Sequence, residues 1–104
     1  MKKYKVNNKA GVANGTSLRG YCKTTYDTLV EKLGEPLTGH SGDGKITCEW
    51  VIEFPDNTVG TIYDWKTKET PKGEYAWHIG GKGVNVLEKI SELLGVSTST
   101  NYWN

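Results

Sequence analysis

Apolar residues recur with a helical period in residues 24–34 of the chain. The stripe consists of Tyr26, Leu29, Val30 and Leu33. Four positions at i, i+3, i+4 and i+7 share one side of an α-helix, so the spacing predicts an amphipathic helix here. Thr24 or Thr25 is placed to cap its start. Gly34 and Pro36 predict its end, because glycine closes helices and proline cannot continue them.

A second helical stripe follows a glycine-rich segment near the end of the chain. Its members are Val84, Leu87, Ile90 and Leu94. This spacing predicts a helix over residues 84–94, and Gly95 is placed to terminate it.

Between these helices, apolar and polar residues alternate with a period of two. This predicts strands at residues 46–54, 58–66 and 75–79. We expect a two-residue turn at Asp56-Asn57 to join the first two strands into a hairpin. That register pairs Phe54 with Val59, Ile52 with Thr61, Trp50 with Tyr63, and Cys48 with Trp65. It places all these side chains in the core, together with Tyr75, Trp77 and Ile79 of the third strand.

The predicted elements define an α+β domain with the order α-β-β-β-α and a possible short strand at Tyr4–Val6. We expect two layers: a three- to four-stranded antiparallel sheet with both helices on one face. A length of 104 residues predicts a single domain, residues 1–104. Residues 1–15 and 96–104 are expected to be less ordered.

The net charge and the cysteines limit the partners and the cellular compartments that we expect. The formal net charge of +1 argues against a protein that coats extended DNA, although it leaves room for a local basic patch. The sequence predicts no signal peptide and no membrane span. Cys22 and Cys48 form no C-x-x-C motif, which indicates a reducing, cytoplasmic setting. A disulfide between them is the alternative.

Three titratable residues are candidates for a metal or proton-transfer site. In the expected register Glu49 lies opposite Asp64, and His78 points to the same face. The simpler interpretation is a solvated polar sheet face, which the absence of a spaced motif such as H-E-x-x-H favours.

Two glycine-rich segments with a basic residue precede the predicted helices, at residues 15–20 (GTSLRG) and 80–83 (GGKG). Glycines let backbone N–H groups approach a ligand, and a helix N-terminus favours anions. A phosphate-bearing ligand would contact Arg19, Gly20, Gly80, Gly81, Lys82 and Gly83. The alternative is that these glycines form tight turns, because Val84 follows where a P-loop requires Ser or Thr.

Aromatic residues outside the predicted elements are candidates for a protein interface: Tyr21, Tyr102 and Trp103. The aromatic residues of the strands could instead form a stacking surface for bases, but their alternation favours the core. Cys22, paired with His40 or His78, is a conceivable nucleophile, yet no G-x-S-x-G or similar elbow is present. The sequence therefore predicts no enzyme and no cofactor.

Several segments resemble a group of short, largely uncharacterised proteins of tailed bacteriophages. They are TSLRGY, TTYDTLVEKLGEP, EWVIEF, TIYDWK and WHIGG, and the resemblance covers residues 16–95. The helix followed by an antiparallel meander is also similar, in architecture alone, to small inhibitor domains of the periplasmic β-lactamase-inhibitor type.

The phage resemblance implies a small accessory protein that antagonises host antiviral defence by stoichiometric binding. The expected partner is a defence protein such as a CRISPR effector, in the cytoplasm of an infected bacterium. A sponge for a cyclic nucleotide or another phosphate-bearing immune signal is the alternative, and a metal-dependent hydrolase is a further one. Homo-oligomerisation stays open.

Overall fold

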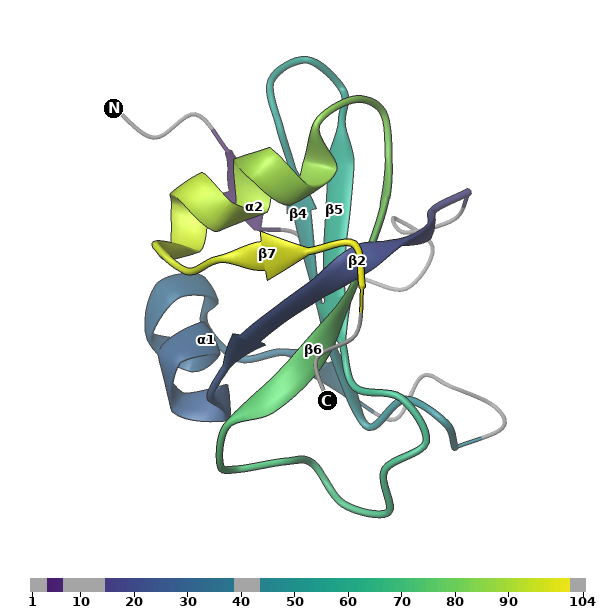
Figure 1. The fold of residues 1–104 in the computed structure, drawn as a ribbon, viewed down its shortest axis with the longest axis vertical. Helices are drawn as coiled ribbons and strands as arrows, with labels where there is room; N and C mark the ends of the chain where they lie inside the picture. Colours follow the sequence, from purple (N-terminus) through teal and green to yellow (C-terminus); the bar gives the residue numbers. More distant parts are fainter. Residues whose placement is uncertain (1–3, 7–14, 39–43, 102–104) are drawn as a thin grey trace.

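The computed structural model describes residues 4–6, 15–38 and 44–101, which form an α+β fold dominated by one antiparallel sheet (Figure 1). The two helices are α1 (Tyr26–Leu33) and α2 (Val86–Leu94). The long strands are β2 (Ser17–Thr24), β4 (Cys48–Glu53), β5 (Val59–Tyr63) and β6 (Tyr75–Lys82). Two-residue strands are β1 (Lys5–Val6), β3 (Leu37–Thr38) and β7 (Thr98–Ser99).

The predicted three- to four-stranded sheet and the predicted element order α-β-β-β-α are wrong, because two strands precede α1 and a further one follows α2. Over the described residues the sheet has seven strands in the order β1-β4-β5-β6-β2-β7, and β3 also pairs with β4. The main omission is β2, which pairs with β6 along its whole length. Its inward positions are Gly20, Cys22 and Thr24. Because these side chains are small or polar, the segment lacks the alternation of large apolar residues that reveals a half-buried strand.

The predicted register of the hairpin between β4 and β5 is also wrong, by one residue. The turn contains three residues, because Asn57 takes a left-handed conformation (φ 69°) and donates its N–H to the Phe54 carbonyl at 3.1 Å. Trp50 therefore lies opposite Ile62, and Glu49 lies opposite Tyr63. A slip of one residue exchanges the faces of a strand, so Tyr63 and Trp65 leave the core.

The core lies between the inner face of the sheet and the apolar sides of both helices. At its centre the rings of Trp50 and Trp77, both fully buried, meet edge to face with centroids 5.6 Å apart. Each indole N–H is satisfied by a backbone carbonyl: Trp50 donates to Gly34 at 2.8 Å and Trp77 to Thr24 at 3.1 Å. The surrounding apolar residues are Ile52, Ile62 and Ile79 from the sheet, Leu29 and Leu33 from α1, and Val86, Ile90 and Leu94 from α2.

Local signals predict α1 well and α2 less well. Thr25 caps α1 by accepting the Thr28 N–H, and Gly34 closes it at φ 85°. By contrast, α2 begins two residues later than predicted, because Asn85 is left-handed (φ 55°) and Val84 is 64% exposed instead of packed. In Figure 1, β7 runs beside α2. Neither described helix is long and apolar enough to cross a membrane.

Candidate functional site

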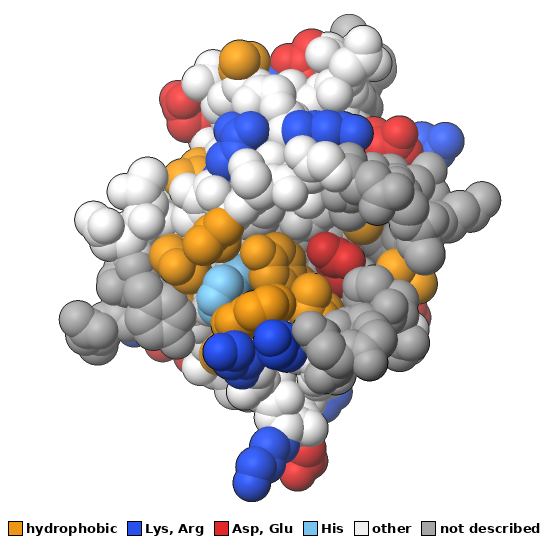
Figure 2. All heavy atoms as spheres, turned by 90° about the vertical axis from the view of Figure 1, so that its right-hand side faces the viewer, with side chains coloured by type: hydrophobic (Ala, Val, Ile, Leu, Met, Phe, Trp, Pro, Cys, Tyr) orange, Lys and Arg blue, Asp and Glu red, His pale blue; other side chains and the backbone are white. Residues whose placement is uncertain are grey.

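Four aromatic side chains lie together on the face of the sheet opposite the core, and we call them the outer cluster: Tyr21, Tyr63, Trp65 and His78. His78 of β6 lies directly opposite Tyr21 of β2 on one side and Tyr63 of β5 on the other. Trp65 follows β5 two residues after Tyr63. Figure 2 shows this surface as hydrophobic side chains gathered around a histidine, with basic side chains next to them.

His78 is the centre of the outer cluster. Its ring centroid lies 5.0 Å from that of Tyr21, 5.5 Å from that of Tyr63 and 6.4 Å from that of Trp65. Trp65 is 39% exposed, whereas the other three side chains are half-buried. The surface is therefore a row of rings across three adjacent strands, in which each ring contacts that of His78. The row ends in the accessible indole of Trp65.

Glycine at position 80 makes the close packing beneath the cluster possible. A Cβ atom at Gly80 would lie 2.7 Å from Thr61 Oγ1 and 3.5 Å from Cε1 of Tyr63. The candidate phosphate-binding glycine therefore has a packing role, as it leaves room for the Thr61 hydroxyl.

The charges near the outer cluster are mainly those of lysines. Lys45 places its Nζ atom 5.7 Å from the centroid of the Trp65 ring, and the exposed Lys66 follows Trp65 directly. The exposed Lys23 lies two residues beyond Tyr21 on β2. Two carboxylates of β4 share this face: Glu49 lies opposite Tyr63 and is 8% exposed, and Glu53 lies farther along the strand, opposite Lys5 and Val59.

Burial favours the neutral forms of two residues of the cluster, His78 and Tyr63. Desolvation lowers the pKa of His78 below its ordinary value of 6.5, and the charge of Asp64 opposes this shift only in part. Desolvation, followed by the charges of Glu49 and Tyr21, raises the pKa of Tyr63 above 10.0. The cluster thus offers neutral aromatic surface bordered by cations.

The three candidate metal ligands do not form a site. Glu49 and His78 lie on the outer face, but the fully buried Asp64 is occupied by backbone and hydroxyl donors. Its Oδ1 accepts the N–H groups of Thr47 at 2.7 Å and Cys48 at 3.2 Å. Its Oδ2 accepts the hydroxyls of Thr47, at 2.6 Å, and Thr67. Within the described part of the chain, no group of three or more His, Cys, Asp or Glu residues could hold a metal ion.

The two glycine-rich segments are brought together, but as strands instead of loops. Ser17 pairs with Gly81 and Leu18 with Gly80, and a bulge follows at Arg19. Beyond β6, Arg19 donates from Nη1 to the Gly83 carbonyl at 3.0 Å.

Two of these glycines serve close packing. A Cβ atom at Gly81 would lie 2.7 Å from both Cγ atoms of Val86, and one at Gly20 would lie 2.3 Å from the Ser99 carbonyl oxygen. Lys82, at the end of β6, is exposed.

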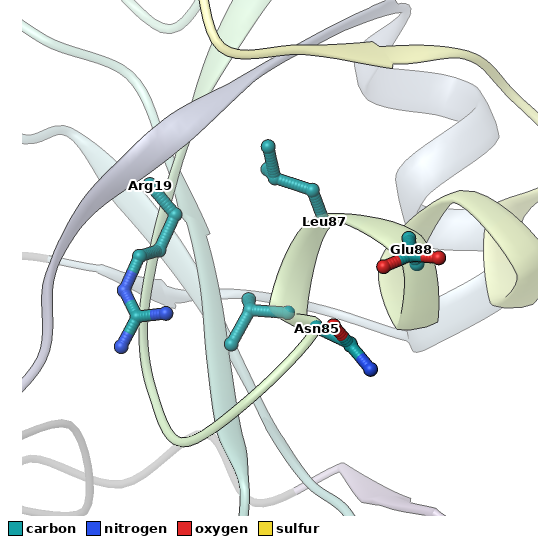
Figure 3. A pocket seen from close by; sticks show the side chains of 5 residues that line it. Arg19, Asn85, Leu87 and Glu88 are labelled. Carbon is teal, nitrogen blue, oxygen red and sulfur yellow. The ribbon is translucent and has the colours of Figure 1, made fainter.

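A shallow pocket of about 280 Å³ adjoins Arg19 at the start of α2 (Figure 3). Its lining residues are Arg19, Asn85, Val86, Leu87 and Glu88, of which the sequence singled out only Arg19 as a ligand contact. The N-cap residue Asn85 makes no side-chain capping bond. Glu88, however, adds a negative charge in the first turn, which weakens this pocket as an anion site.

The two cysteines are free and buried, so the disulfide considered from the sequence is not formed. Burial raises the pKa of Cys22 to about 12. The pKa of Cys48 rises to about 11, through burial and then the charge of Asp64. Both thiols are protonated at neutral pH, a state unsuited to nucleophilic attack.

Of the predicted interface residues, Tyr21 belongs to the outer cluster, while Tyr102 and Trp103 lie outside the described residues, as does His40. The sequence pattern favoured the core for Tyr63 and Trp65 and left a stacking surface as the alternative. The signal that could have corrected this is Pro55-Asp56-Asn57, since Asn tolerates the left-handed position that ends a three-residue hairpin turn.

Comparison with known proteins gives no match to any family model, curated protein or solved structure.

Proposed function

We propose that the protein acts by stoichiometric binding, not by catalysis, and that the outer cluster is its binding surface. The observation that carries this proposal is the position of Trp65, a large aromatic side chain left 39% exposed beside the rings of Tyr63 and His78. Aromatic residues of this kind dominate the binding energy of interfaces, because they bury much apolar area with little loss of conformational entropy.

The partner we propose is a component of host antiviral defence, in particular a CRISPR effector. The protein would then be a phage accessory protein working in the cytoplasm of an infected bacterium. The resemblance of residues 16–95 to small phage proteins supplies this context. Support from the molecule comes from the outer cluster, which presents aromatic rings with a lysine beside them.

Phage plating on a bacterium with an active CRISPR system tests this proposal. Cells that express the wild-type chain should allow a targeted phage to form plaques, because the chain protects the phage from the CRISPR system. Trp65→Ala should abolish this protection of the phage. Val84→Ala is the matched control, because Val84 is also an exposed apolar residue but lies outside the cluster. Protection should rise in proportion to protein level, as stoichiometric blocking requires. Equal protection by wild type and Trp65→Ala at equal protein levels contradicts the proposal.

Sequestration of a phosphate-bearing signal is the second candidate, and it is favoured by one observation. The pocket beside Arg19 adjoins a helix start that lacks a side-chain cap. This candidate predicts that Arg19→Ala, not Trp65→Ala, removes protection.

A further inference from the structure

We propose that the outer cluster binds single-stranded nucleic acid, with bases stacked on its rings and phosphates held by Lys45, Lys66 and Lys23. This inference rests on the proposed function and assigns a chemical class to the part of the partner that is bound. A CRISPR effector carries a guide RNA and displaces a DNA strand, so it offers single-stranded segments to such a surface.

The arrangement of the rings is the first argument. Tyr21, His78 and Tyr63 occupy directly opposed positions on three neighbouring strands. Adjacent strands of a sheet are about 4.8 Å apart, so the row spans about 10 Å. A platform of this size accommodates two or three splayed bases, which is how aromatic sheet faces bind single strands. Trp65 extends the row beyond the end of β5.

The charge around the rings is the second argument. Lys45 contacts the Trp65 ring, Lys66 follows it, and Lys23 lies along β2 from Tyr21. Lysine is depleted in protein–protein interfaces, whereas contacts between lysine and phosphate are the main source of affinity for nucleic acids. The aromatic surface bordered by lysines therefore complements a ligand of bases and phosphates better than it complements a polypeptide.

The carboxylate nearest the rings limits the path of the bound nucleic acid. Glu49 lies opposite Tyr63 on β4, next to the cluster and away from β2. Its charge repels phosphates, so the backbone of the strand follows the lysines and the bases point toward the rings.

The openness of the face distinguishes a polymer from a free nucleotide. Sites for small ligands enclose most of the ligand surface in a concave pocket. The outer cluster is a row across a sheet, and the pocket beside Arg19 is lined by different residues. A single-stranded nucleic acid that crosses several rings gains affinity from each of them, whereas a mononucleotide can stack on only one.

Fluorescence anisotropy with a labelled ten-residue oligothymidylate at low salt tests the inference. We expect wild-type protein to bind, and Trp65→Ala and Tyr21→Ala each to weaken binding about tenfold, as measured for lost base stacking elsewhere. Val84→Ala should bind as the wild type does. Melting temperatures of all variants identify any that are unfolded, and the milder Trp65→Leu, which removes the indole but keeps an apolar side chain, should also weaken binding.

Salt dependence provides the second readout. Each phosphate contact on a single strand contributes about 0.7 to the slope of log K against log salt concentration. Lys45→Ala combined with Lys66→Ala should therefore reduce the slope by about 1.4, whereas Lys32→Ala, on α1, should leave it unchanged.

Three outcomes overturn the inference: no binding by folded wild-type protein, wild-type affinity in both Trp65→Ala and Tyr21→Ala, or binding of thymidine monophosphate as tight as that of the oligonucleotide. If the oligonucleotide does not bind but Trp65→Ala still abolishes plaque formation by the targeted phage, the inference fails and the proposed function stands, with a polypeptide as the bound partner. If the targeted phage plates equally well on cells that express Trp65→Ala and on cells that express the wild type, the proposed function itself is overturned.

Discussion

The two faces of the sheet carry similar aromatic residues in opposite roles. On the inner face, Trp50 and Trp77 are fully buried, and backbone carbonyls accept both indole N–H groups. On the outer face, Trp65 is 39% exposed and lies beside Lys45. The difference shows that aromatic content does not identify the core. The register of one hairpin decides which rings stabilise the fold and which are available to a partner.

If this comparison is right, the largest loss of stability should come from the inner face. Trp77→Ala should lower the free energy of unfolding by about 3–5 kcal/mol, because it leaves a large cavity between the sheet and the helices. Urea denaturation followed by circular dichroism measures the change. Trp65→Ala should cost about 1 kcal/mol or less in the same experiment. Similar losses for both variants would remove the distinction between the faces.

The next largest effect tests whether Asp64 is structural or a metal ligand. Asp64→Asn should cost about 2–3 kcal/mol, because an amide presents a donor where the carboxylate accepts hydrogen bonds from Thr47, Cys48 and Thr67. The exposed Asp27→Asn is the control and should cost less than about 1 kcal/mol. EDTA should not change the denaturation midpoint of the wild type; a shift with EDTA would indicate a metal at this carboxylate.

A smaller effect tests the role assigned to the glycines. Gly81→Ala should destabilise the protein by about 1–3 kcal/mol, because its Cβ would collide with Val86 and with the Val59 carbonyl oxygen, 2.8 Å away. Gly73→Ala, with no atom within 4 Å of the added Cβ, should stay within about 0.5 kcal/mol of the wild type. Equal behaviour of the two variants would contradict a packing role at position 81.

The smallest expected effect is a pH dependence that originates in the outer cluster. Folding lowers the pKa of His78, so below pH 6.5 the unfolded chain binds more protons than the folded one. The contribution of the neutral imidazole is fully present above pH 6.5 and is lost as the pH falls toward the folded pKa. Melting temperature measured from pH 7.5 to 5 should therefore fall less in His78→Asn than in the wild type. If the melting temperatures of both proteins fall equally with pH, burial does not lower the pKa of His78.

How much the sequence could predict depended on whether the signal was local. The helix α1 was predicted because its cap, its apolar stripe and the closing Gly34 all lie within a dozen residues. The strand β2 was missed because its inward side chains are small, and only pairing with the distant β6 makes it a strand.

The candidate site depended on a single residue of register. Placing the turn at Asp56-Asn57 put Tyr63 and Trp65 in the core and Asp64 beside Glu49. The left-handed Asn57 reverses all of these assignments at once. The strand β5 carries apolar or aromatic residues on both faces, for example Ile62 inside and Tyr63 outside. Its sequence pattern therefore could not show which of the two faces is buried.

The central claim is that the outer cluster serves binding and not folding, and the most direct measurement is the plating efficiency of a targeted phage on CRISPR-active cells that express Trp65→Ala at the wild-type protein level. We predict that the targeted phage forms no plaques on these cells although the variant melts within a few degrees of the wild type. Plaque formation at the wild-type level with this folded variant would contradict the claim.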